Sequence, residues 1–202
     1  MGGLRFGAIG SSAVHLCVDL QRLFAAEGPW PMPWMEPILP RVHRLAARHA
    51  ERTVFTRFVP PRTPQDRPGR WRAYFEHWRG ATLSQLDPAL VDLVPDLAAL
   101  VPPARVVDKP AYSAFTAPAL APLLAAGSVD TLIVTGGETD VCVLATVLGA
   151  IDRGYRVILA RDGICSSADA QHDRLIAFYE ERFSHQLEVA EVEEVLEAWD
   201  AG

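Results

Sequence analysis

Short apolar segments alternate along the chain with segments whose apolar residues recur at helical spacing, and this alternation limits the possible folds more than any other feature. The segment DTLIVTG (130–136) is a nearly continuous apolar and β-branched run, which is typical of a strand buried on both faces. Residues 139–153 then keep helical spacing until Gly154, which predicts a helix that ends there. Further strands are expected at 13–20, 53–58, 104–109, 155–160 and in LEVA, and further helices at 36–50, 71–78, 116–127, 168–183 and in VEEVLEAW.

This order of elements predicts an α/β fold with a doubly wound, mostly parallel six-stranded sheet, Rossmann-like and covered by helices on both faces. The 202 residues contain no repeat, no low-complexity tract and no linker. We therefore expect a single domain over residues 1–202. Residues 59–70 hold four prolines and are expected to form an irregular excursion.

Composition excludes several classes of protein. No apolar run approaches the roughly 20 residues that span a bilayer, so we expect a soluble, cytoplasmic protein with no membrane partner. The net charge of −6, without a basic cluster, gives nucleic acid no docking surface. The three cysteines are too widely spaced to suggest a disulfide framework. The six histidines show no metal-ligand spacing, so we expect no metal and no other cofactor. The aromatic residues of segment 71–78 lead us to expect a homo-oligomer, a dimer or tetramer.

Three chemically distinctive residues follow predicted strands. Asp19 and Lys109 each come at the end of one, and Cys142 lies just after the turn that ends DTLIVTG. Lys109 is also the only lysine among 19 basic residues. Because ligands bind beyond the carboxyl ends of strands in open α/β sheets, a carboxylate, an ammonium group and a thiol are expected to converge at one edge.

This combination of residues can perform nucleophilic acyl transfer on a small-molecule substrate. Thr139 is expected to be a helix N-cap, which would place Cys142 in the first turn, where the helix dipole and Lys109 stabilise a thiolate. Asp19 could carry the thiol proton, and backbone amides of the turn could bind an oxyanion. Cys142 and Asp19 could also have purely structural roles. Cys142 could be a buried packing residue, and Asp19 could be a turn residue or a helix cap. Cys17 is expected in the core, and Cys165 in a loop, where it is either reactive or packing.

Three segments of the chain, VDLQRLF, DKPAYSAF and GGETDVCVLATVLGAIDRGYRV, resemble in order and spacing the active-site segments of the isochorismatase-like cysteine hydrolase superfamily. The resemblance extends from about residue 13 to residue 190. It implies an Asp19–Lys109–Cys142 triad in which Asp19 shuttles protons, Lys109 lowers the thiol pKa and Cys142 forms a thioester. It also implies a cis peptide bond between Gly137 and Glu138, in an oxyanion-binding turn that includes Val141.

Two departures narrow the activity that the resemblance implies. Metal-dependent nicotinamidases of the superfamily carry a T-R-D-x-H pattern, and the corresponding stretch here is FTRFVPPRTP. True isochorismatases lack a cysteine at the position of Cys142. Metal-free hydrolysis of a small amide, carbamoyl compound or ureide therefore remains. The expected pocket walls are Gln21, Phe24, Tyr112 and Phe115; whether Glu138 or the 60–80 segment also contacts substrate is open.

Three other readings stay open. The chain could be a catalytically idle member of the superfamily that acts as a binding or oligomeric scaffold. It could also be an isochorismatase-type ether hydrolase. A thiol-transfer protein would need a second cysteine near Cys142, and only Cys165 could supply it.

Overall fold

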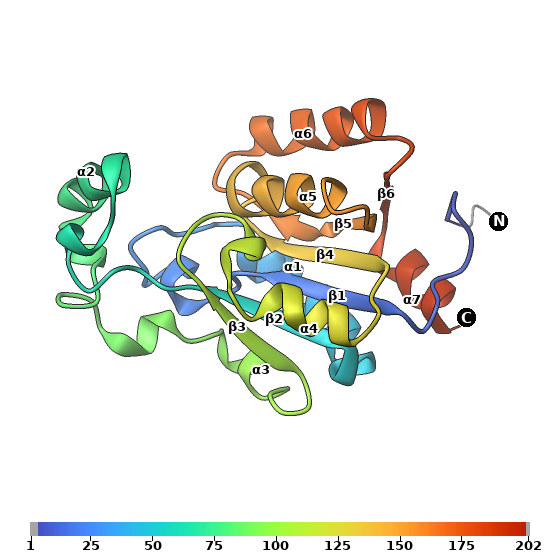
Figure 1. The fold of residues 1–202 in the computed structure, drawn as a ribbon, viewed down its shortest axis with the longest axis horizontal. Coiled ribbons are helices and arrows are strands. Elements are labelled where there is room, and N and C mark those ends of the chain that lie inside the picture. The colour runs from blue at the N-terminus through green and yellow to red at the C-terminus, as the bar shows by residue number, and fades with distance from the viewer. Residues whose placement is uncertain (1–3, 201–202) are drawn as a thin grey trace.

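A six-stranded sheet forms the centre of the computed structural model, which describes residues 4–200 (Figure 1). Its strands run in the order β3-β2-β1-β4-β5-β6, and every neighbouring pair is parallel. The predicted fold class is thereby confirmed. The strands are β1 Ala13–Val18, β2 Thr53–Phe58, β3 Arg105–Lys109, β4 Thr131–Gly137, β5 Arg156–Cys165 and β6 Leu187–Ala190.

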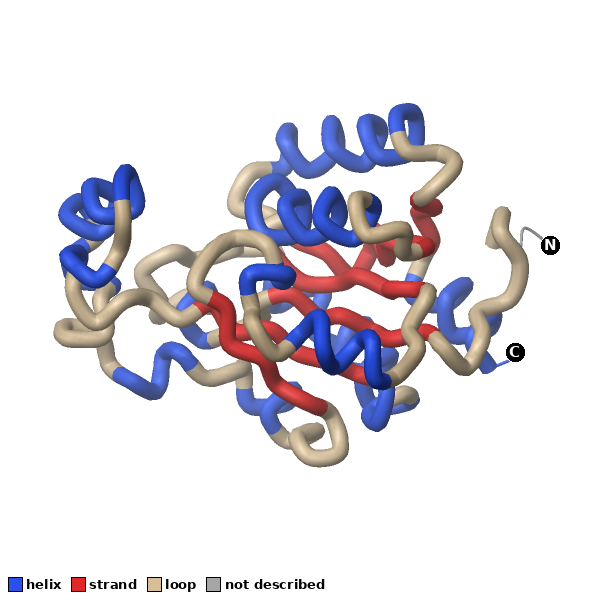
Figure 2. Tube along the Cα trace, in the orientation of Figure 1, coloured by secondary structure: helices blue, strands red, loops and turns tan. Residues whose placement is uncertain are grey.

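Helices cover both faces of this sheet. Figure 2 shows the strands in the middle, with α4, α5 and α6 on one face and α1 and α7 on the other. The chain order reverses between β1 and β4, which is the point where doubly wound sheets bind ligands. The helices are α1 Met35–Arg48, α2 Gly69–His77, α3 Pro95–Ala98, α4 Leu120–Ala126, α5 Leu144–Ile151, α6 Asp169–Arg182 and α7 Val192–Asp200.

The two central strands are apolar because both of their faces are covered. Every residue of β1 and β4 is buried. Successive side chains of a strand point to opposite faces, so Val134 packs with Leu120 and Val147, whereas its neighbour Ile133 packs with Leu45 on the other face. This two-sided packing explains why DTLIVTG shows no polar alternation.

The helix expected over 139–153 is not uniform. Residues Thr139–Val143 form a π-helical turn, and α5 begins only at Leu144. The buried face nevertheless continues from the π-helical turn into α5, where Thr146, Val147 and Ala150 are buried and Leu148 is exposed.

Two other elements differ in length from the prediction. The helix expected over 116–127 begins only at Leu120, because Pro118 disfavours helical backbone at Ala117, which is extended. In the other direction, β5 continues past a register shift to Cys165, which pairs with Gly137. The prediction that Cys165 lies in a loop is therefore wrong; it is the last, buried residue of a strand.

The connection between β2 and β3 is long and mostly irregular, as the prolines predict. It carries α2 away from the sheet, and Figure 1 shows this helix apart from the other helices. Within residues 4–200, no helix combines the length and apolar character needed to cross a membrane.

Candidate active site

Asp19 follows the last residue of β1 and turns the chain away from the sheet with a φ of 52°. Neighbouring Thr56 on β2 fixes its position. The Asp19 amide donates to the Thr56 carbonyl oxygen (3.3 Å) and to Thr56 Oγ1 (3.2 Å), and Thr56 Oγ1 donates in return to Asp19 Oδ1 (2.6 Å). The second carboxylate oxygen, Oδ2, therefore remains available for other groups.

Lys109 ends β3 with its side chain fully buried. Its Nζ lies 2.6 Å from Asp19 Oδ2 and donates to the carbonyl oxygens of Ala111 (2.9 Å) and Tyr112 (2.8 Å). Burial by itself lowers the pKa of the Lys109 ammonium, but the charges of Asp19 and Cys142 raise it, and the net shift is upward. Lys109 is therefore a fixed positive charge at neutral pH.

Cys142 lies in the π-helical turn that follows β4 and is 7% exposed. Burial raises the pKa of its thiol, and so does the Asp19 carboxylate, while Lys109 lowers it; hydrogen bonding to the same two groups acts in the same directions. The net shift is upward. The expectation of a stabilised thiolate is therefore wrong for the resting protein, because desolvation and a negative neighbour outweigh one ammonium group.

These three side chains converge at the carboxyl edge of the sheet, as the positions of the strand ends predicted. Asp19 Oδ2 is paired with the Lys109 ammonium, yet among the described residues no hydrogen bond of ordinary geometry reaches this oxygen. It can thus accept a proton from the protonated Cys142 thiol. The arrangement combines a nucleophile, a base and a permanent cation in a dry site.

The turn before Cys142 contains the cis peptide bond between Gly137 and Glu138. Glu138, not Thr139, precedes the first helical residue, so the predicted N-cap is wrong; the Thr139 hydroxyl instead donates to the carbonyl oxygen of Cys165 (3.0 Å). The amide of Val141 donates to the Glu138 carbonyl oxygen (3.1 Å). Val141 therefore does not offer a free N–H to an oxyanion, in contrast to the expectation.

Close packing explains the two glycines of the turn. Gly136 has a φ of 108°, and a Cβ there would lie 2.0 Å from the carbonyl oxygen of Val18 in β1, so a side chain at this position would displace backbone. A Cβ on Gly137 would lie 2.4 Å from Met32 Sδ, so a side chain there would require the Met32 side chain to move.

Three of the four expected pocket walls have side chains engaged in packing or in hydrogen bonds within the fold. Gln21 is buried, and its side chain bonds to backbone atoms of Phe58 and Val91. Phe24 is buried against Trp30, with the ring centroids 6.1 Å apart. Phe115 stacks on Tyr155 and lies under Arg153, beyond the far end of α5. Each belongs to the packing of the fold, which the sequence pattern could not distinguish from a pocket wall.

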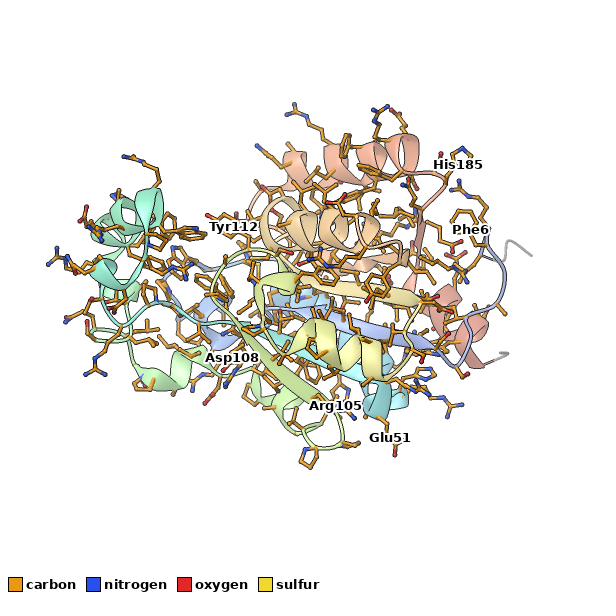
Figure 3. The ribbon with its side chains drawn as sticks, in the orientation of Figure 1. Phe6, Glu51, Arg105, Asp108, Tyr112 and His185 are labelled. Carbon is orange, nitrogen blue, oxygen red and sulfur yellow. The ribbon has the colours of Figure 1, made fainter. Side chains whose placement is uncertain are left out.

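Tyr112 is the expected wall residue that the structure places at the site. Its carbonyl oxygen accepts from Lys109, and its ring is 39% exposed. Figure 3 shows it on the side of the molecule from which α2 projects, whereas Phe6 and His185 lie at the opposite end. Burial raises the pKa of Tyr112, and so do the charges of Cys142 and Glu138, whereas Lys109 lowers it; the net shift is upward.

The structure adds two aromatic residues, Phe58 and Trp30, that sequence reasoning missed, and it places them next to Tyr74 of the 60–80 segment. The Phe58 ring lies 5.4 Å from Lys109 Nζ, and Trp30 contacts Phe58 (6.2 Å) and Tyr74 (6.2 Å). Burial, followed by charges that include Tyr112 and Cys142, raises the pKa of Tyr74 to about 12. Phe58 could have been found from the sequence because it ends a predicted strand at the same edge. Trp30 lies in a proline-rich loop and gave no such signal.

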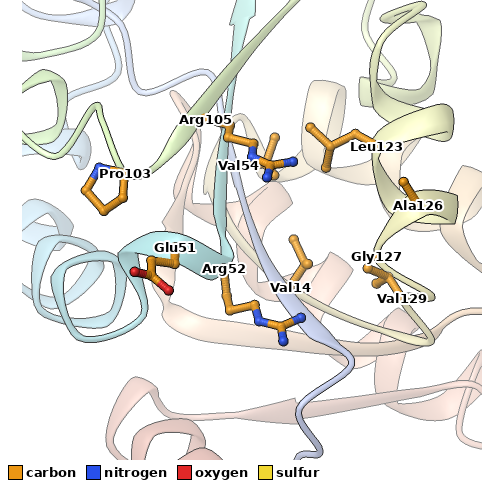
Figure 4. Close-up of a pocket in the computed structure, with 10 residues that line it drawn as sticks. All are labelled: Val14, Glu51, Arg52, Val54, Pro103, Arg105, Leu123, Ala126, Gly127 and Val129. Atoms are coloured by element: carbon orange, nitrogen blue, oxygen red, sulfur yellow. The ribbon is translucent and has the colours of Figure 1, made fainter.

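One cavity of the protein lies away from the candidate active site. It has a volume of about 510 Å³ and lies near the amino ends of the strands, beside α4. Figure 4 shows the side chains of Arg52 and Arg105 with Val14 between them in this view. Asp19, Lys109 and Cys142 do not line it. Among the described residues, no three His, Cys, Asp or Glu side chains are grouped so as to bind a metal ion.

Sequence comparison adds independent findings. The family model of the isochorismatase domain matches residues 13–191. A segment of 68 residues is 37% identical to maleamate amidohydrolase from Pseudomonas putida, over 34% of this chain and 32% of that protein. The chain therefore aligns with only about a third of the length of this relative.

Comparison with solved structures shows the same fold in other hydrolases. A cysteine hydrolase from Pseudomonas syringae pv. phaseolicola 1448A superposes with a TM-score of 0.83 at 24% identity, covering 96% of this chain and 95% of that chain. N-carbamoylsarcosine amidase from Thermoplasma acidophilum gives 0.72 at 17% identity, covering 90% and 96%. At these identities the likeness establishes the fold.

Proposed function

Because this chain belongs to the isochorismatase family, we propose that it is a cysteine hydrolase that cleaves the C–N bond of a small amide, carbamoyl compound or ureide. The observation that carries the proposal is the buried contact of Asp19 with Lys109 beside the Cys142 thiol. The relatives with amidase names support the same reaction class, although each name describes that protein alone.

The reaction begins with a protonated thiol. As Cys142 Sγ attacks the substrate carbonyl carbon, Asp19 Oδ2 takes the thiol proton, and the carbonyl π electrons move to oxygen. The tetrahedral intermediate collapses, the C–N bond breaks, and Asp19 returns the proton to the leaving nitrogen. A thioester of Cys142 and an amine or ammonia result. Asp19 then takes a proton from a water molecule, whose oxygen attacks the thioester carbonyl carbon. The C–S bond breaks, the carboxylic acid product is released, and Asp19 returns the proton to sulfur, which restores the thiol and the carboxylate.

Lys109 stabilises the charged stages of this cycle. The two carbonyl oxygens that accept from Nζ hold the ammonium in place, so it need not reorganise when negative charge moves from Asp19 to sulfur. Because the net pKa shift of Lys109 is upward, it does not compete as a proton donor at neutral pH. The oxyanion is assigned to other amides of the turn, since the Val141 amide is already bonded.

The surroundings favour a small substrate with a flat non-reacting end. Phe58, Tyr74 and Tyr112 supply aromatic surface near Lys109 and Cys142. Rings bind flat groups well because they offer a large apolar area with little loss of side-chain entropy. Tyr112 is proposed as a substrate contact, and Glu138 as a second one.

A panel of small amides, carbamoyl compounds and ureides, assayed for ammonia release, tests the proposal. The wild type is expected to turn over at least one compound, and Cys142→Ala to lose the activity by about a thousandfold or more. Cys17→Ala is the matched control, because Cys17 is a buried thiol of the core. In parallel, iodoacetamide labelling followed by peptide mass spectrometry is expected to modify Cys142.

Failure of both turnover and Cys142 labelling would instead favour a catalytically idle scaffold. Two observations support a catalytically idle scaffold: the pKa of the Cys142 thiol is raised, and the residue is almost fully buried.

A further inference from the structure

A second pocket lies on the other side of the turn that carries Cys142. It has a volume of about 320 Å³ and opens between the start of α1, the end of β5 and the start of α6; its lining includes Trp34, Ile38, Ile164, Ser166, His172 and Asp173. The lining does not include Asp19, Lys109 or Cys142. We call it the β5–α6 pocket. Its size is sufficient for a small ligand.

Hydrogen bonding fixes the proton on His172. The Thr139 hydroxyl has one hydrogen, which it donates to the carbonyl oxygen of Cys165. It must therefore accept at its 2.9 Å contact with His172 Nδ1, so Nδ1 carries a hydrogen. In a neutral imidazole with this tautomer, Nε2 has no hydrogen and is an acceptor.

Ser166 has likewise used its only donor. The residue is 2% exposed, and its Oγ donates to Asp140 Oδ1 at 2.6 Å. The remaining lone pairs of Oγ can only accept, and one of them faces the amide of Ala168 (3.4 Å). Ser166 thus adds an acceptor to the pocket.

The other polar groups of the lining also attract positive charge. Asp173 supplies a carboxylate, and Trp34, whose side chain is half exposed, supplies an indole face of the kind that binds cations. No lysine or arginine is among the described residues that line this pocket. Glu138, which accepts from the amide of Ser167 at 3.2 Å, adds negative charge nearby.

From this inventory we infer that the β5–α6 pocket binds a small organic cation with N–H donors, of the primary alkylammonium class. The ammonium group would donate to Asp173, to His172 Nε2 and to Ser166 Oγ. The alkyl chain would lie on the apolar side chains of Ile38 and Ile164. Carboxylates and phosphates are disfavoured because the Asp173 carboxylate in the lining repels negative charge. This inference does not depend on the proposed hydrolase activity.

Isothermal titration calorimetry at pH 8 with n-butylammonium tests the inference. Saturable, millimolar binding is expected to the whole protein, with no binding of butyrate and weaker binding of tetramethylammonium, which has the charge but no N–H donor. Absence of saturable n-butylammonium binding, or equal binding of butyrate, overturns the inference.

Two variants locate the site. Asp173→Asn, at an exposed position on α6, is expected to weaken n-butylammonium binding by about fivefold, which is the usual strength of one exposed charge pair. Glu181→Gln is the matched control, since it removes an exposed carboxylate of the same helix outside the pocket lining. Equal weakening by both variants contradicts a specific site.

A third arm separates this pocket from the candidate active site. Protein alkylated at Cys142 is expected to bind n-butylammonium as tightly as the untreated protein, whereas Trp34→Leu combined with Asp173→Asn is expected to abolish binding. Loss of binding after alkylation of Cys142 would place the cation in the candidate active site and overturn the assignment.

Discussion

Two buried thiols near the same edge of the sheet have different neighbours. Cys142 lies beside Asp19 and Lys109. Cys165 is the last residue of β5, and its Sγ lies 3.9 Å from Met32 Sδ. Among the described residues, no ammonium group lowers the pKa of this thiol. Burial raises the pKa of both thiols, and the neighbouring carboxylate of each, Asp19 or Glu138, raises it further.

The comparison shows that a raised pKa alone does not separate a nucleophile from a packing residue. What distinguishes Cys142 is the fixed positive charge of Lys109 beside the sulfur, together with hydrogen bonding to the Asp19 carboxylate, which can take its proton. Cys165 has the Glu138 carboxylate nearby but no fixed positive charge among the contacts that the structure describes, so it is expected to be inert. Substitutions at Asp19, Lys109 and Cys165 test this difference.

Removal of the proton acceptor is expected to have the largest effect. Asp19→Asn keeps the shape of the side chain but cannot take the thiol proton, so kcat/KM should fall by about 10²–10⁴-fold. The substitution also leaves Lys109 buried without its counter-ion, which is expected to cost about 3 kcal/mol in the free energy of unfolding. Ammonia-release kinetics and urea denaturation measure the two effects separately.

Asp108→Asn is the matched control for Asp19→Asn. Asp108 is an exposed carboxylate next to Lys109 in β3 and pairs with Arg57. Its loss is expected to leave activity unchanged and to cost less than about 1 kcal/mol. Equal activity of Asp19→Asn and the wild type would remove the assigned proton carrier.

Loss of the fixed cation is expected to separate the two thiols kinetically. Lys109→Met removes the one neighbour that lowers the pKa of Cys142, so the thiolate fraction and the rate of its alkylation at pH 8 should fall by about tenfold. The alkylation rate of Cys165 serves as the internal control and should not change. If both rates fell together, the cause would be altered access to the turn rather than charge.

The smallest effect concerns stability at alkaline pH. The ordinary thiol pKa is 9.0, and that of Cys165 in the folded protein lies well above it. Between these values the folded thiol keeps its proton while the unfolded one loses it, so the stabilisation is complete below pH 9 and is lost as pH rises. Cys165→Ala should therefore unfold with a pH dependence flatter by up to about 1.4 kcal/mol per pH unit above pH 9.

Urea denaturation at pH 7.5 to 10.5 measures this slope. Below pH 8.5 the wild type and Cys165→Ala should show the same pH dependence, even if their absolute stabilities differ. Identical slopes at pH 10 would show that the Cys165 thiol titrates normally in the folded state, which would contradict its assignment as an inert packing residue.

Local sequence patterns were enough to predict the sheet and the strand ends at which the candidate site is built. Alternating apolar strands and helices are local patterns, so the ends of β1, β3 and β4 could be read directly. Because carboxyl ends of parallel strands share an edge, Asp19, Lys109 and Cys142 were expected together, and the structure brings them together. Gly154 likewise ends its helix by a backbone rule, with a φ of 81°.

The direction of the Cys142 pKa shift and the surroundings of the expected pocket walls depend on tertiary structure. Whether a thiol is charged depends on desolvation and on distances to other charges, which no local pattern contains. Gln21 and Phe115 lie close to Asp19 and Lys109 in sequence. In the structure, however, the Gln21 side chain donates to the Val91 carbonyl oxygen, and the Phe115 ring stacks on Tyr155. Residues adjacent in the chain share an edge of the sheet, but the direction of each side chain follows from packing between segments far apart in sequence.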